Sequence, residues 1–136
     1  MFTFFGLFAD PATDLPQRIA EAWPDLKLTR LEHPISAVAV RFNEDDQNRL
    51  GEGILPPDVL RTIELISVEV PANRFLLLRT ECFGGICHNW GRIIQDGRTL
   101  FEAEGDGALR RLIGHWGVDI GPQEIFEPLS RSFKWD

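Results

Sequence analysis

The sequence predicts a single α+β domain with a two-layer, mostly antiparallel sheet packed by about two helices. Its 136 residues match the usual length of one domain, and no linker divides residues 1–136. The first half alternates strand-like and helix-like segments in the order β-α-β-β. The second half contains strand-like segments joined by two-residue turns, which is typical of a β-meander.

The first half begins with a predicted buried strand over residues 2–9, where Phe and Leu dominate without a helical period. Asp14 and Gln17 have the spacing of a capping box for the helix that follows. The apolar residues of that helix fall on one face: Leu15, Ile19, Ala22 and Trp23. Residues 26–31 are predicted to be extended, and the β-branched segment 35–42 is predicted to be the next strand.

The middle of the chain contains several helix-breaking residues, and a short helix is predicted from Pro57 through Ile63. Residues 65–70 alternate partly between apolar and polar, which favours an extended segment. The meander then consists of three strands and two turns: 75–83, Gly84-Gly85, 86–95, Asp96-Gly97 and 98–102.

The last part of the chain is predicted to form a helix and a docked tail. Asp106 is placed to cap the helix, and Gly117 is placed to end it in a left-handed conformation. Residues 119–136 carry too many large apolar groups for a free tail, so we expect them to pack on the sheet. One sheet face is then covered by helices, and the other is polar or covered by another segment.

The net charge of −7 disfavours some classes of binding partner and favours others. Such a charge repels phosphate backbones, so nucleic-acid binding is not expected. It suits a soluble cytoplasmic protein, or a protein that docks a basic partner. No apolar run reaches the roughly 20 residues of a membrane span, and the first strand lacks the basic leader of a signal peptide, so no membrane association is expected.

Cys82 and Cys87 face each other across the predicted Gly84-Gly85 turn. The favoured interpretation is a reduced pair packed side by side, and a disulfide or redox pair is the alternative. His88 points to the sheet face opposite Cys87, so no zinc site is expected. A cross-strand contact between His88 and Glu81 is favoured over general-base catalysis.

The sequence matches none of the familiar catalytic, nucleotide-binding or calcium-binding motifs. The sequence has no serine nucleophile elbow, no dinucleotide fingerprint and no Walker loop, so neither a catalytic residue nor a cofactor is predicted. Glu44, Asp45 and Asp46 do not fit a calcium loop, because the positions that need further oxygen ligands hold Leu50 and Pro57. The acidic run is therefore interpreted as surface charge or a docking surface.

Four short stretches form a loose pattern: Glu81-Cys82-Phe83-Gly84-Gly85, Asp96-Gly97, the Ala-Leu-Arg segment of 107–112, and the acidic-Phe segment of 124–129. This pattern resembles that of small bacterial cytoplasmic proteins, many of them uncharacterised and some similar to immunity proteins that neutralise a toxin. Cys87-His88-Asn89 stand where the pattern usually has Gly-Gln. The resemblance implies a non-catalytic protein with a protein partner, and it implies no catalytic residues.

Three functions remain open at this point. The favoured one is an interaction protein of the immunity type that binds a basic toxin or other partner. The candidate partner-binding residues are Glu44, Asp45, Asp46, Glu81, Phe83, Gly84, Gly85, His88 and Trp90. The alternatives are a small thiol-dependent enzyme that uses Cys82 or Cys87 with His88 and Glu81, and a module that binds a small molecule between the sheet and the C-terminal segment.

Overall fold

The protein folds around a six-stranded antiparallel sheet of strand order β2-β3-β1-β4-β5-β6. The computed structural model describes residues 2–42, 57–130 and 133–135. The described elements are β1 (Phe2–Ala9), α1 (Leu15–Ala22), β2 (Thr29–Leu31), β3 (Ala37–Arg41), α2 (Pro57–Glu69), β4 (Phe75–Phe83), β5 (Ile86–Gln95), β6 (Arg98–Glu104), α3 (Ala108–Ile113), and the 3₁₀ turns η1 (Gly114–Trp116) and η2 (Glu127–Leu129). The predicted α+β class with a mostly antiparallel sheet is confirmed.

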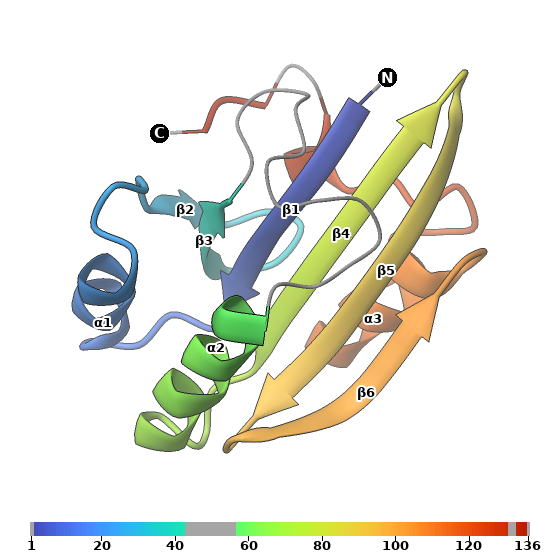
Figure 1. The fold of residues 1–136 in the computed structure, drawn as a ribbon. Coiled ribbons are helices and arrows are strands. Elements are labelled where there is room, and N and C mark those ends of the chain that lie inside the picture. Colours follow the sequence, from blue (N-terminus) through green and yellow to red (C-terminus); the bar gives the residue numbers. More distant parts are fainter. Residues whose placement is uncertain (1, 43–56, 131–132, 136) are drawn as a thin grey trace.

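Side chains of the central strand β1 alternate between two hydrophobic cores. Phe5 and Leu7 pack toward α1 and α2, and we name this side the α2 face of the sheet. Phe4 and Phe8 pack on the other side, the α3 face, toward α3 and the C-terminal segment. Figure 1 shows α2 in front of the sheet and α3 behind it. Every residue of β1 is buried because both faces are covered.

Helix α2 continues to Glu69, so the extended segment predicted for residues 65–70 is wrong. Val59, Ile63 and Ile66 are buried at helical spacing, whereas Leu65 and Val68 lie exposed. Packing of the buried stripe therefore outweighs the partial alternation of the sequence. At 13 residues α2 is the longest described helix, and no helix in residues 2–42, 57–130 and 133–135 is long and apolar enough to cross a membrane.

The helix ends differ from the sequence prediction in two places. Asp14 precedes α1 but makes no side-chain cap, and Gln17 donates instead to Glu21, one turn along the helix. Gly107 rather than Asp106 occupies the N-cap position of α3, and no side-chain cap comes from that position. The left-handed Gly117 is confirmed at a φ of 71°.

The C-terminal segment packs on the α3 face, as its apolar residues predict. The ring of Phe126 meets that of Phe8 edge to face at 5.3 Å, and Trp135 lies 5.3 Å from Phe4 between ring centroids. Phe126 is almost fully buried. This segment brings residues far apart in the sequence into one core.

A partly buried ion pair joins the end of β1 to the start of β4 and to η1. Both carboxylate oxygens of Asp10 accept hydrogen bonds from the Arg74 guanidinium, at 2.9 and 3.0 Å, and Oδ2 also accepts the Arg74 backbone N–H at 2.8 Å. The Trp116 indole donates to the same carboxylate at 2.8 Å, and Arg74 lies over its ring. This cluster attaches η1 to the sheet.

Candidate functional site

The β4–β5 hairpin has the register that the two-glycine turn predicts. Phe83 pairs with Ile86, Cys82 with Cys87 and Glu81 with His88. Gly84 and Gly85 have φ angles of 57° and 84°, which glycine adopts without the steric cost of a side chain. The tip lies at the far end of the hairpin from α2, which contacts the β5–β6 turn through the hydrogen bond from Gly97 to Ser67 (Figure 1).

Alternation along β4 and β5 divides the hairpin into two chemically different sides. The α3 face carries the Cys82–Cys87 and Thr80–Asn89 pairs. Over the same stretch near the tip, the α2 face carries the pairs Phe83–Ile86, Glu81–His88 and Arg79–Trp90. A partner that meets one side of the hairpin therefore does not meet the other.

The two cysteines form a disulfide, which corrects the favoured expectation of a reduced pair. Cys82 and Cys87 are directly opposite in the β4–β5 register, and their side chains lie on the same face of the sheet. Two cysteines in this arrangement have Cβ atoms close enough for their sulfur atoms to bond. Both residues are at least partly exposed, so the bond closes the hairpin near its tip rather than within the core.

Two large apolar side chains project from this tip into solvent. Phe83 is 74% exposed and Ile86 is 78% exposed, more than the other exposed large apolar residues of the described chain. Residues 75–78 are buried in the core, whereas the tip is free of it.

Polar side chains follow the tip along the α2 face of β5 and β6. His88 contacts Glu104 at 2.9 Å, and the Trp90 indole donates to Glu102 at 3.0 Å. The predicted contact of His88 with Glu81 is therefore wrong, because β6 lies on the other side of β5 and offers the ring a nearer carboxylate. Glu81 lies 3.5 Å from the Arg79 guanidinium instead.

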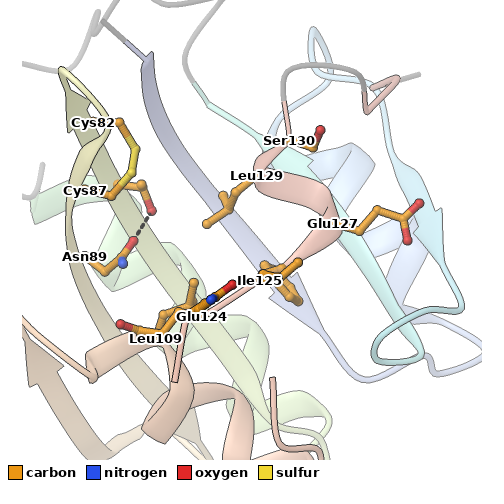
Figure 2. A pocket seen from close by; sticks show the side chains of 13 residues that line it. Cys82, Cys87, Asn89, Leu109, Glu124, Ile125, Glu127, Leu129 and Ser130 are labelled. Carbon is orange, nitrogen blue, oxygen red and sulfur yellow. Dashed lines mark hydrogen bonds between the residues drawn. A yellow bond between two sulfur atoms is a disulfide. The ribbon is translucent and has the colours of Figure 1, made fainter. Parts of the chain in front are cut away.

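A pocket of about 410 Å³ lies on the α3 face, between the hairpin and the C-terminal segment. Figure 2 shows Cys82, Cys87 and Asn89 on one side of it and Leu129 and Ile125 on the other. Thr80 donates a 2.7 Å hydrogen bond to Oδ1 of Asn89, and both side chains are buried. The volume falls in the range of small-molecule sites.

Glu124 holds the C-terminal wall of this pocket against α3. Its carboxylate accepts the backbone N–H groups of Gly107 and Arg110, at 3.1 and 2.8 Å. These are the free N–H groups of the first turn, so Glu124 supplies the cap that the sequence prediction assigned to Asp106.

A surface ion pair supports the same wall. Arg110 donates to both oxygens of Asp119, at 2.7 and 2.8 Å, and the Gly121 N–H donates to Oδ1. The hydrogen bonds from Arg110 and then Gly121 lower the pKa of Asp119 to about 2. The same contact raises the pKa of Arg110.

The hairpin does not assemble the residues of a thiol enzyme. Both sulfurs are bonded to each other, and His88 lies on the face opposite Cys87. A thiolate nucleophile with an adjacent base needs a free sulfur and an imidazole on the same side. In the described ranges of the chain, no group of three or more His, Cys, Asp and Glu residues is placed to hold a metal ion.

The structure brings together part of the predicted partner-binding set. Glu81, Phe83, Gly84, Gly85, His88 and Trp90 all lie on one hairpin. Glu44, Asp45 and Asp46 lie outside the described residues. The prediction missed Thr80 and Asn89, although their period-two spacing from Cys82 and Cys87 places them on the same face.

The pocket lies between the sheet and the C-terminal segment, where the alternative of a small-molecule module placed its site, although the sequence did not single out residues 123–130 as the wall. Comparisons of the chain with protein-family models, curated proteins and solved structures find no match.

Proposed function

We propose that this protein is a non-catalytic interaction protein whose β4–β5 hairpin tip docks into an apolar cleft of a basic partner protein. The observation that carries the proposal is the pair of exposed side chains, Phe83 and Ile86, at the tip. Solvent-exposed aromatic and aliphatic groups of this kind are the usual anchors of a protein interface.

The disulfide supports this function by restricting the tip before binding. Cys82 and Cys87 are joined directly behind Phe83 and Ile86, and the two-glycine turn closes the other side. A binding element that is ordered in the free protein loses less conformational entropy when it docks. The hairpin therefore presents its two anchors at a low entropic cost.

Charge favours a basic protein as the partner. The whole chain has a net charge of −7. The carboxylates beside the anchors, Glu81, Glu102 and Glu104, already contact Arg79, Arg92 and His88, so the preference for a basic partner comes from the charge of the whole chain. A net negative charge attracts a basic protein and repels phosphates. A toxin with a basic active surface is the class that the resemblance to immunity proteins suggests.

The test uses each basic protein that the genes neighbouring this one encode. We expect one of these purified proteins to form a complex with this chain that isothermal titration calorimetry detects. Replacing both anchors, Phe83→Ser with Ile86→Ser, should weaken the complex by at least about 30-fold, because a hot-spot anchor contributes about 2 kcal/mol or more. The matched control is Leu65→Ser, which removes an apolar side chain that is 59% exposed on α2.

Two results would overturn the proposal. One is that no basic product of the neighbouring genes binds the chain. The other is a complex whose affinity is the same for the wild type, the Leu65 control and the variant at the tip.

A further inference from the structure

We infer that the pocket on the α3 face binds a small uncharged molecule that presents a carbonyl or hydroxyl oxygen to Asn89 and a short apolar group to the opposite wall. The site lies on the other side of the sheet from the partner-binding residues of the α2 face. The inference is therefore independent of the proposed interaction function.

Asn89 supplies the polar contact. Its side chain is 6% exposed, and its Oδ1 atom accepts the hydrogen bond from Thr80, itself 1% exposed. Within the described part of the chain, the Nδ2 group donates no hydrogen bond. Figure 2 shows the amide pointing from β5 into the space between the hairpin and the C-terminal segment. Nδ2 is not closed off from solvent, since it opens to the pocket, where an acceptor atom of a bound molecule can take the place of water.

Thr80 determines which end of the amide meets the ligand. Its hydroxyl donates to Oδ1, which leaves the two N–H bonds of Nδ2 on the pocket side. The site is therefore built to meet an oxygen acceptor. Since Thr80 and Asn89 are neighbours across the β4–β5 ladder, the donor is held on a rigid element.

The lining opposite Asn89 contains both apolar and polar groups. Its apolar part includes Leu109 and Phe126, which are buried at 1% and 4% exposure, and Leu129. Gln123, Glu124, Glu127 and Ser130 also line the pocket. An alkyl or small ring on the ligand that packs on the apolar part would be removed from water, which is favourable in proportion to the area covered.

Charge excludes anions. The described lining residues include the carboxylates Glu124 and Glu127 and no Lys, Arg or His. A carboxylate or phosphate ligand would meet like charge without a cation to balance it. The ligand class is thus a neutral amide, ketone or alcohol of a few carbons.

The experiment compares hexanamide with hexanoate, which has the same alkyl chain but is an anion at neutral pH. Each probe is titrated into the ¹⁵N-labelled full chain, and the readout is the side-chain N–H₂ signals of Asn89. We expect hexanamide to shift these signals saturably with a Kd of about 1–10 mM, the range for a ligand of this size. Hexanoate should bind at least about tenfold more weakly.

Two variants locate the contact. Asn89→Leu removes the donor and should weaken hexanamide binding by about tenfold, followed through the backbone signals of Leu109 and Leu129. The matched control is Gln95→Leu, which removes an amide at the other end of β5, where it contacts Pro71. If the Asn89 variant does not fold, the comparison of the two probes on the wild type decides the question.

The inference is overturned if hexanamide leaves the Asn89 side-chain signals in place, because water alone then meets the amide. It is also overturned if hexanoate binds as tightly as hexanamide. Binding that is unchanged in Asn89→Leu would likewise remove Asn89 as the recognition group.

Discussion

Removing the disulfide should lower the free energy of unfolding by about 2 kcal/mol. The two cysteines are five positions apart, so the bond closes a loop of their own two residues and the four between them. For a loop this short, the chain-entropy relation gives a loss of about 7 cal/mol/K in the unfolded state, or about 2 kcal/mol at room temperature. The double variant Cys82→Ser with Cys87→Ser tests the value.

The substitution changes little else in the structure, so the change in the free energy of unfolding can be attributed to the loss of the disulfide. Cys82 and Cys87 are both partly exposed, so serine hydroxyls in their place remain in contact with water. The ladder between β4 and β5 continues well beyond the cysteines, so the native hairpin should persist. Urea unfolding should therefore show a lower midpoint with a similar slope.

A reductant provides the internal control. Reduced wild type should unfold at the same urea concentration as the double variant, and the variant should not respond to the reductant. Iodoacetamide should label the unreduced wild type at neither cysteine. Labelling of both cysteines without reductant, together with a loss below about 0.5 kcal/mol in the variant, would refute the reasoning and restore the reduced pair.

Two further predictions concern stability. Asp10→Ala should lower the free energy of unfolding by about 3 kcal/mol in urea denaturation, because it leaves Arg74 and the Trp116 indole without their shared acceptor. Asp119→Asn should remove a contribution to the free energy of unfolding that depends on pH. The pKa of Asp119 in the folded protein is about 2, below its ordinary value of 3.8, so its contact with Arg110 stabilises the fold above about pH 4 and loses this effect as the pH falls toward 2.

Each of these has a control. Asp25→Ala removes an exposed carboxylate and should change stability by less than about 0.5 kcal/mol, and an equal effect of the two alanine variants would contradict the role of Asp10. For Asp119, calorimetric melting temperatures of wild type and variant should converge as the pH is lowered through that interval. A difference that stays constant down to about pH 2 would exclude the ionised carboxylate as its cause.

The sequence by itself determined most of the strands, the two turns and the β4–β5 register. Gly84-Gly85 and Asp96-Gly97 occupy positions with positive φ, and a two-residue turn sets the pairing of the residues next to it. In β5 and β6 this pairing changes beyond Ile94, where a register shift places Ile93 opposite Phe101. The β4–β5 register was enough to place Cys82 opposite Cys87 and to separate His88 from both. Local chemistry decides these features, so local sequence predicts them.

The tertiary structure alone decided which neighbours these side chains meet. His88 contacts Glu104 because β6 lies beside β5, and Glu124 caps α3 from the far side of a loop. Helix α2 extends through residues that alternate, since burial of Ile66 against the sheet outweighs the local pattern.

The pocket, too, depends on the tertiary structure. Residues 80–89 and 123–130 are far apart in the sequence, and they form one cavity only because the C-terminal segment covers the α3 face. Periodicity shows which face of a strand a side chain occupies, but not which distant segment packs on that face. The buried amide of Asn89 is therefore evident only after the chain has folded around it.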